Sequence, residues 1–456
     1  MNNRVSRGTA LLVAILSSFL TPFMASSVNI ALPSIGREFA MSAVSLSWVA
    51  TSYLLAAAVF LVPMGRIADI YGRKRVFLYG VVIYTVSSLI LPMSTSGTML
   101  ISLRVVQGIG ASMIFGTSIA ILTSVFPVGE RGRALGINVA TVYAGLSLGP
   151  FLGGLLTEHF QWRSIFLANV PLGLIMIVFV LWKLKGDWAE ARGEKFDVTG
   201  SIIYGVTLVT VMYGLSMLPD ILGGWLILIG VLGLFAFIRY EMKAKSPVLD
   251  VNLFASSRVF AFSNLAALIN YSATWAVSFL LSLYLQYVRG LSPQNAGFVL
   301  VSQPLVMAAF SPFAGRLSDK LEPRILASVG MALSAIALLL LALLDEETAF
   351  GFIIASLAIA GLGLALFSSP NTNAIMSSVE TKFYGVASGT VGTMRLIGQM
   401  LSMGISMLLI ALYVGRVEIT PEYYPLFLKS AKVAFVIFAA LCFGGVFASL
   451  ARGKLR

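Results

Sequence analysis

Long runs of apolar residues, each bounded by charged or turn-forming residues, follow one another along the whole chain. The runs are continuous and lack the alternation of apolar and polar residues that marks the strands of a membrane barrel. A helix crosses the hydrocarbon core of a bilayer with about 20 apolar residues and satisfies its own backbone groups there. The pattern therefore predicts an all-α integral membrane protein with fourteen transmembrane helices, over residues 9–33, 45–66, 76–95, 98–126, 133–158, 162–184, 197–217, 221–240, 258–288, 293–316, 324–344, 348–379, 383–414 and 426–450.

A polar segment interrupts this pattern between the second and third predicted helices. It reads Gly65-Arg66-Ile67-Ala68-Asp69-Ile70-Tyr71-Gly72-Arg73-Lys74-Arg75, and a shorter version, Gly315-Arg316-Leu317-Ser318-Asp319, joins the tenth helix to the eleventh. The matched positions predict two equivalent six-helix halves and an inserted helix pair, with boundaries at 1–184, 185–257 and 258–456. Two parallel repeats with a path between them near the middle of the bilayer are typical of membrane transporters.

The composition excludes a water-soluble fold. Of the 456 residues, 58% are hydrophobic and 11% are charged, whereas a soluble protein carries about 25% charged residues. The mean hydropathy is +0.93. We therefore expect the lipid bilayer to surround the chain, and the short predicted loops leave no room for a soluble domain.

The net charge of +12 has two explanations. One is an acidic partner such as nucleic acid, and the other is positive charge that keeps loops on the cytoplasmic side of the membrane. Most of the 31 lysine and arginine residues fall at helix ends on the same side as the N-terminus. This bias favours the second explanation and predicts a cell-membrane protein with both termini in the cytoplasm. We expect a monomer that binds a small-molecule substrate and no nucleic acid.

Enzyme chemistry has little support in the sequence. The chain has one cysteine, Cys442, and one histidine, His159, so it cannot form an intrachain disulfide or a Cys/His metal cluster. An intramembrane enzyme needs an activated nucleophile, a carboxylate pair or metal ligands, and the predicted mid-membrane segments supply none. We expect no metal, no cofactor and no enzymatic activity.

The polar segment after the second helix is a candidate gate. Asp69 is a carboxylate at the membrane edge among several basic residues, and Gly65 permits close approach of another backbone. A basic loop that only sets topology is the simpler explanation, but topology needs no aspartate at matched spacing in both halves. The repeat favours a charge latch in which Asp69 and Arg73 take part, with Asp319 as the counterpart of Asp69 and Arg131 as a further gating residue.

Two arginines, Arg104 and Arg395, lie inside apolar runs. A charge in the bilayer costs roughly 2.5 kcal/mol or more, so each is expected to face the bundle interior or a wet cavity. Snorkelling to the interface is the alternative for Arg104, which is close to a helix start. These arginines and nearby polar residues are the candidate lining of the substrate path: Asn29, Arg104, Asn270, Asn371, Asn373, Arg395 and Gln399. Hydrogen bonding between helices explains Asn270, Asn371 and Asn373 almost equally well.

The fifth predicted helix carries a stripe of glycines, Gly145, Gly149 and Gly153, spaced four residues apart. Such a stripe lets another helix approach closely, and Pro150 removes one helix hydrogen bond and permits a bend. General helix packing explains the stripe, and the added hypothesis is that this surface slides or rocks.

Together these motifs resemble the major facilitator superfamily, specifically its fourteen-helix drug:proton antiporter branch. The resemblance rests on four segments: Gly65–Arg75, then Arg104 with Gln107 and Gly108, then Gly145, Gly149, Pro150, Gly153 and Gly154, and then Glu158-His159-Phe160-Gln161-Trp162-Arg163. It implies a gate at the Gly65–Arg75 turn on the cytoplasmic side and a role for Arg104 in proton coupling. It also implies two halves that rock about a central cavity.

One position departs from that branch. The family usually has an aspartate in the first helix, before an ending that here reads Asn29-Ile30-Ala31-Leu32-Pro33, and this chain has Met24 there. A buried carboxylate is the natural proton carrier and the natural partner of a cationic drug. Its absence favours a neutral, zwitterionic or anionic substrate, or proton coupling through helix-end acids such as Asp69 and Glu158.

The sequence therefore predicts a secondary active transporter that exports small amphipathic compounds by alternating access, with proton antiport. The alternative is an exporter or leaflet-to-leaflet translocator of an anionic or zwitterionic amphiphile or lipid, coupled through residues other than a first-helix carboxylate.

Overall fold

The computed structural model describes residues 7–126, 128–184, 186–244, 247–249, 251–318, 320–380 and 384–453. Within these ranges the secondary structure is helical, with no strand. Fourteen helical segments there are long and apolar enough to cross a membrane. The predicted fold class and the predicted number of spans are therefore confirmed.

Nine of the spans are single helices, and five are built from more than one piece. These five are α3 with a 3-10 turn at Leu91–Met93, α6 with α7, α11 with α12 and a π-helical turn at Tyr284–Val288, α13 with α14, and a 3-10 turn at Pro421–Tyr423 with α18. A short helix, α10, precedes α11. The helices are α1 Arg7–Phe39, α2 Ala43–Tyr71, α3 Arg73–Ile90, α4 Gly97–Val125, α5 Val128–Phe160, α6 Arg163–Leu167, α7 Asn169–Trp182, α8 Val198–Met217, α9 Ile221–Glu241, α10 Asn252–Ser256, α11 Arg258–Thr274, α12 Ala276–Leu283, α13 Pro293–Leu300, α14 Ser302–Ser318, α15 Pro323–Leu341, α16 Phe350–Ser377, α17 Tyr384–Tyr413 and α18 Tyr424–Ala451.

Two helix ends lie beyond the spans expected from the sequence. α1 continues through Pro33 to Phe39, and α2 continues to Tyr71 instead of ending near residue 66. α2 stops only at Gly72, whose φ of +117° favours glycine and breaks the helix. The Gly65–Arg75 segment is therefore the last part of α2, one glycine and the first residues of α3.

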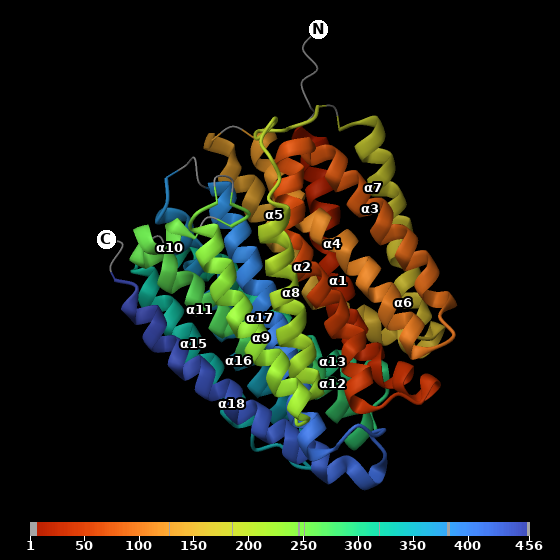
Figure 1. Cartoon of the computed structure of the whole chain (residues 1–456). Coiled ribbons are helices and arrows are strands. Elements are labelled where there is room, and N and C mark those ends of the chain that lie inside the picture. The colour runs from red at the N-terminus through yellow and green to blue at the C-terminus, as the bar shows by residue number, and fades with distance from the viewer. Residues whose placement is uncertain are drawn as a thin grey trace.

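The helices before α8 and those after α9, here called the first half and the second half, repeat the same pairs of packed helices. In the first half α1 packs on α5, α2 on α4, and α3 on α4 and α7, and the matching pairs in the second half are α11–α17, α14–α16, α15–α16 and α15–α18. The halves meet where α5 packs on α13 and α2 packs on α17, which are again matching pairs. Figure 1 shows the first half, coloured from red to olive, beside the second half, coloured from green to blue.

The inserted pair, α8 and α9, lies beside the boundary between the halves. α8 packs against α9, and it also packs against α2 from the first half and α17 from the second. Near the start of α8 the Tyr204 hydroxyl donates to the carbonyl of Ala58 on α2 at 3.0 Å. At its far end the carbonyls of Ser216 and Met217 accept hydrogen bonds of 3.1 and 3.0 Å from Arg416, which follows α17. α8 is thus hydrogen-bonded to a different half near each of its ends.

Glycines bring two helix pairs into close contact, and they do so at matching places. A Cβ on Gly110 of α4 would lie 2.7 Å from the backbone nitrogen of Tyr84 and 2.9 Å from the carbonyl oxygen of Gly80, both on α3. A Cβ on Gly363 of α16 would lie 2.7 Å from the carbonyl oxygen of Gly330 on α15. Backbone atoms cannot rotate away as a side chain can, so both crossings require glycine.

We expect Gly110→Ala and Gly363→Ala each to lower the apparent melting temperature in detergent, because the added methyl group overpacks a helix crossing at a cost of roughly 1–3 kcal/mol. Gly224→Ala in α9 is the matched control, since nothing lies within 4 Å of a Cβ there. Fluorescence-monitored thermal unfolding of the purified variants measures the effect. Equal melting temperatures in all three variants would contradict the close packing described here.

Candidate functional site

Residues 186–197, which join α7 to α8, lie over the junction of α2 and α3. We call this segment the acidic linker, and we call the end of the bundle at which it lies, where α1 also begins, the basic end. The amide of Arg73 donates to the carbonyl of Trp188 in the linker at 2.9 Å. A Cβ on Gly72 would overlap the carboxylate of Asp187. Glycine is therefore required at Gly72 for the close approach of the linker as well as for the backbone angle.

Ion pairs fasten the acidic linker to this junction. Arg73, only 7% exposed, donates from Nε to Asp69 at 2.8 Å, and from both terminal nitrogens to Glu190 at 2.8 and 3.0 Å. It also donates to the hydroxyl of Ser124 on α4 at 2.7 Å. Two further pairs link the same segments: Arg66 with Glu194, and Arg75 with Asp187 at 3.0 Å. The candidate gate residues Asp69 and Arg73 therefore hold the linker against the first half.

The other candidate gate residues are less fully placed. Gly65 lies where α4 packs on α2, with its nitrogen 3.4 Å from the position of a Cβ on Gly116. Arg131 belongs to a stretch of α5 whose side chains are not described, and Asp319 lies outside the described residues. Their gating roles stay predictions.

The glycine stripe of α5 faces α1 within the first half. Cβ atoms on Gly145 and Gly153 would lie 2.6 and 2.7 Å from atoms of α1, and a Cβ on Gly149 would also clash with that helix. The carbonyl of Pro150 instead approaches Gly297 of α13, in the second half. The stripe thus allows close packing of α5 on α1 within the first half, while the neighbouring face of α5 packs on α13 of the second half.

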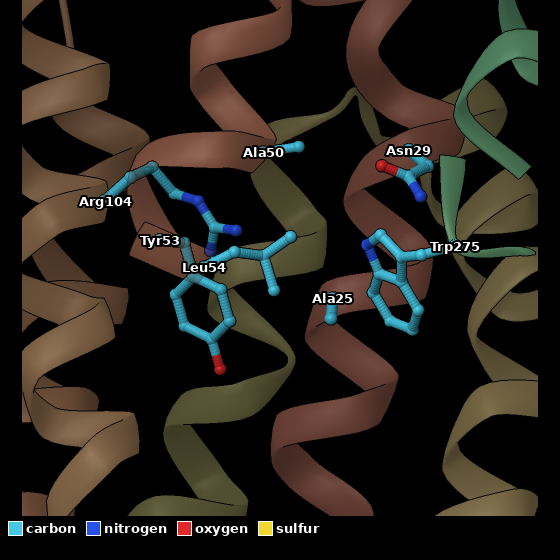
Figure 2. Close-up of a pocket in the computed structure, with 7 residues that line it drawn as sticks. All are labelled: Ala25, Asn29, Ala50, Tyr53, Leu54, Arg104 and Trp275. Carbon is cyan, nitrogen blue, oxygen red and sulfur yellow. The ribbon is translucent and has the colours of Figure 1, made fainter. Parts of the chain in front are cut away.

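Arg104 and Asn29 line one small pocket, which has room for about one water molecule. Figure 2 shows the Arg104 side chain next to the ring of Tyr53, and Asn29 beside Trp275. The pocket is lined by Ala25, Asn29, Ala50, Tyr53, Leu54, Arg104 and Trp275. The sequence pointed to neither Tyr53 nor Trp275, because an aromatic residue in an apolar helix carries no pattern of its own.

Arg104 is buried, with 1% of its surface exposed, and its hydrogen-bond partners belong to the first half. Its Nε donates to the carbonyl of Val49 at 3.0 Å, and it also donates to Gln107. Its guanidinium carbon lies 4.3 Å from the centre of the Tyr53 ring. Among the described residues no carboxylate pairs with it. Arg104 therefore does not snorkel, and its charge is stabilised by dipoles and an aromatic face.

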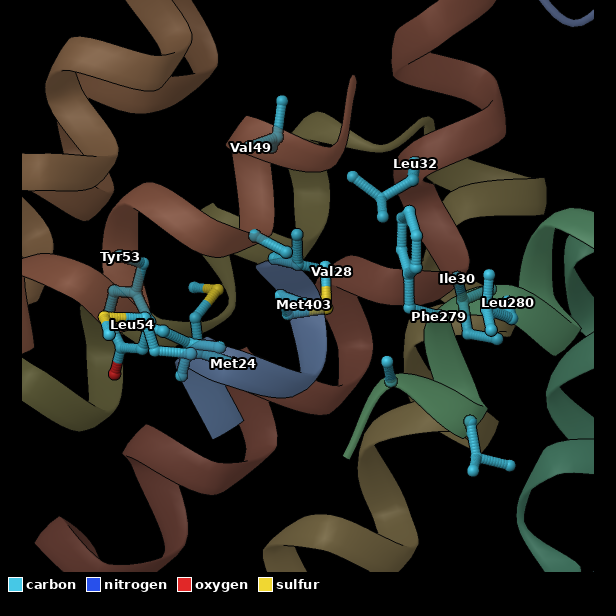
Figure 3. Packing of buried hydrophobic residues seen from close by; sticks show 14 of the residues in the cluster. Met24, Val28, Ile30, Leu32, Val49, Tyr53, Leu54, Phe279, Leu280 and Met403 are labelled. Carbon is cyan, nitrogen blue, oxygen red and sulfur yellow. The ribbon is translucent and has the colours of Figure 1, made fainter. Parts of the chain in front are cut away.

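Met24 occupies the first-helix position at which the related branch has an acid. It is fully buried, and Figure 3 shows it among apolar side chains that include Leu54. Met403 of α17 belongs to the same cluster. The surroundings of Met24 are therefore apolar, as its side chain requires.

Arg395 lies apart from that pocket, in a second cluster where the halves meet. Its guanidinium carbon is 5.2 Å from the centre of the Tyr271 ring on α11. The hydroxyls of Tyr271 and of Tyr143, on α5 of the first half, both reach Ser368 of α16, at 3.4 and 3.0 Å. Gln399, one turn along α17, is buried. Sequence patterns drew attention to Arg395 and missed its hydroxyl-bearing neighbours.

The remaining candidate asparagines are all in the second half. Asn270 is buried with no partner for either amide atom, and Asn373 donates to Ser318 at 3.1 Å. Asn371 accepts a 2.9 Å hydrogen bond from Arg452. Arg452 looked like a loop residue in the sequence, yet only 1% of it is exposed. The seven candidate path residues therefore do not form one site.

Hydrogen bonds between the halves gather at the end opposite the basic end. Ser282 donates to the carbonyl of Asn29 at 2.6 Å and Gln286 donates to that of Ile30 at 2.9 Å. The carbonyl of Asn29 is free for this bond because Pro33, four residues on, has no amide hydrogen. The bend-prone end of α1 is thus also its point of attachment to the second half.

Glu158 joins the halves at this opposite end. Its carboxylate accepts a 3.0 Å hydrogen bond from the backbone amide of Gln294, in the first turn of α13. His159 contacts the side chain of Gln294 at 3.2 Å. A carboxylate at a helix N-terminus satisfies a free amide and interacts favourably with the helix dipole.

We expect Arg73→Gln to lower the stability of the detergent-purified protein by about 2 kcal/mol, because it removes the charged hydrogen bonds that this buried arginine makes to Asp69, Glu190 and Ser124. Arg75→Gln is the matched control in the same turn. Its side chain is 67% exposed, so its loss is expected to cost at most about 1 kcal/mol. Thermal unfolding of both variants tests this. An equal loss of stability in the two variants would contradict the larger contribution of Arg73.

We expect Glu158→Ala to open the opposite end more often, because removing a helix cap costs about 1 kcal/mol and so raises the open population about fivefold. Ala50→Cys, in a chain with Cys442→Ala, reports opening through its rate of reaction with a membrane-impermeant maleimide. Glu422→Ala, an exposed acid at the same end, should leave the rate unchanged. An unchanged rate in Glu158→Ala would show that the cap does not hold the halves together.

No group of three or more His, Cys, Asp or Glu side chains in the described part of the chain could hold a metal ion. The buried groups around Arg104 and those around Arg395 instead offer hydrogen-bonding groups and aromatic faces.

Comparison with known proteins assigns the family. The profile of the Major Facilitator Superfamily matches residues 14–240 and 263–454. A riboflavin transporter, RibZ, of Clostridioides difficile is 31% identical over 84% of this chain and 84% of its own length. The cephamycin export protein CmcT of Amycolatopsis lactamdurans is 33% identical over 86% of this chain and 82% of its own.

A solved structure of the peptide transporter POT has the same fold, with a TM-score of 0.69, 14% identity and coverage of 96% of this chain and 93% of that one. The relatives are transporters, which identifies the chain as a multi-pass membrane transporter of small molecules and not as an enzyme. The chain belongs to the Major Facilitator Superfamily.

Proposed function

We propose that this chain exports small amphipathic compounds across the cell membrane by alternating access, with both termini in the cytoplasm. The observation that carries the proposal is the different bonding of the two ends. Among the described residues, most hydrogen bonds between the halves, such as the bond from Ser282 to Asn29, lie at the opposite end, whereas Arg73 at the basic end pairs within the first half and its linker. Breaking only the opposite-end bonds would let the halves tilt apart there.

Each part of the chain has a role in this proposal. The halves are residues 1–184 and 258–456, with the inserted pair and its linkers at 185–257, and a monomer carries the complete path. Asn29 and Arg104, and at a separate place Arg395, line the path. Asp69, Arg73, Arg131 and Asp319 act at the basic-end gate, and Glu158 at the opposite end.

Proton antiport is the proposed coupling, carried by helix-end acids. Met24 leaves the first helix without the usual acid, and its surroundings are apolar. Glu158 is a suitable carrier, because protonation of its carboxylate would weaken the hydrogen bond to α13 and so favour opening of that end.

We expect proteoliposomes that contain the protein to move protons when a transported compound is added, with a compound panel and a pH-sensitive dye as the readout. Arg104→Gln should reduce transport about tenfold or more, because it removes charged hydrogen bonds beside the pocket. Arg258→Gln, an exposed arginine on α11, is the control. Compound flux with no proton movement would remove the antiport from the proposal and leave the export.

A second candidate function is movement of an anionic or zwitterionic lipid between leaflets. Arg104 and Arg395 favour it, because neither has a carboxylate partner among the described residues and each could bind an anionic group. So does the exposed apolar surface of α9, which includes Trp225 and Phe235. Transport of a cationic dye that is insensitive to added anionic lipid would contradict this candidate.

A further inference from the structure

Arg395, Tyr271, Tyr143 and Ser368 form a cluster, here called the tyrosine–arginine cluster. All four lie inside membrane-spanning segments: Arg395 in α17, Tyr271 in the α11–α12 span, Tyr143 in α5 and Ser368 in α16. Three of them belong to the second half, and Tyr143 belongs to the first. The cluster therefore lies within the membrane-spanning part of the bundle, where the two halves meet.

The guanidinium of Arg395 has unused hydrogen-bonding capacity. Its Nε is buried and has no acceptor, and in the described part of the chain no carboxylate pairs with it. Arg104 differs, because its Nε already donates to the carbonyl of Val49. An arginine in the bilayer is stabilised by an acceptor or a counter-charge, and for Arg395 Tyr271 offers an aromatic face and a hydroxyl that carry no charge.

The groups around Arg395 are suited to an anion. Both tyrosine hydroxyls reach the same Ser368 oxygen, at 3.4 and 3.0 Å, so their polar ends converge on one point. Tyrosine hydroxyls are donors, and the planar arginine fork matches a carboxylate with two parallel hydrogen bonds. The tyrosine rings add flat apolar surfaces, which favour an aromatic or otherwise amphipathic body.

We propose that Arg395, Tyr271 and Tyr143 bind the carboxylate of an amphipathic, preferably aromatic, transport substrate. The carboxylate accepts hydrogen bonds from the guanidinium of Arg395 and from the tyrosine hydroxyls. These hydroxyls exchange their hydrogen bonds to Ser368 for bonds to the carboxylate. Because Tyr143 comes from the first half and Arg395 from the second, the bound carboxylate draws the halves together within the membrane. This inference rests on the proposed function, and it names the substrate class of the path.

Binding of 2-naphthoate and 2-naphthamide to the detergent-purified protein tests the proposal, because the two probes share one ring system and differ in charge. We expect the wild type to prefer 2-naphthoate. Arg395→Gln should weaken 2-naphthoate binding about tenfold or more and leave the affinity for 2-naphthamide unchanged. Arg258→Gln, which removes an exposed arginine from α11, should change neither affinity.

Two further variants protect the test against misfolding. Arg395→Lys keeps the charge and loses the fork, so it should bind 2-naphthoate with intermediate affinity. Tyr271→Phe keeps the ring and loses one donor, so it should weaken only 2-naphthoate. A wild type that binds both probes equally, or a carboxylate preference that survives in the Arg395 variants, would overturn the proposal.

Proteoliposome flux separates this inference from the export function. Flux of a compound panel without any preference for carboxylates would overturn the anion site and leave the exporter. Arg395-dependent binding of 2-naphthoate without flux of any compound would support the site and overturn the exporter.

Discussion

The bilayer core offers no hydrogen-bond partner to a polar group, and much of this structure follows from that constraint. The carbonyl of Asn29, which Pro33 leaves without its helical partner, accepts from Ser282 in the other half. Arg104 is surrounded by a carbonyl, an amide and an aromatic ring. These polar groups are thus satisfied by contacts that also join helices, and the bond from Ser282 joins the two halves.

The two ends of the bundle use different chemistry. The basic end is held by ion pairs between the α2–α3 junction and the acidic linker, with Arg73 at their centre. The opposite end is held mainly by hydrogen bonds between helices of different halves, and Glu158 adds a charged one. The ion pairs lie within the first half and its linker, while the hydrogen bonds connect the two halves and are each weak enough to exchange.

Much of the fold could be predicted from the sequence, because the fourteen apolar runs and the repeated Gly-Arg-x-x-Asp segment can be recognised in a single sequence. Helix ends were less predictable: the end of α2 depends on the backbone angle at Gly72, which the charged residues around it conceal. The arginines were found because a charge is conspicuous in an apolar run. Tyr143, Tyr271 and Arg452 were missed, since the partners that give them meaning are far away in sequence and are brought together only by packing.

The attachments of α8 have a mechanical consequence. This helix is bonded to the first half through Tyr204 near one end and to the second half through Arg416 at the other. A helix of its length, roughly 30 Å, hardly stretches, so it acts as a diagonal strut across the boundary. Any tilt of one half against the other must pivot about this strut or release one of its two anchors. In the proposed transport cycle, the inserted pair would therefore limit how far the two halves tilt.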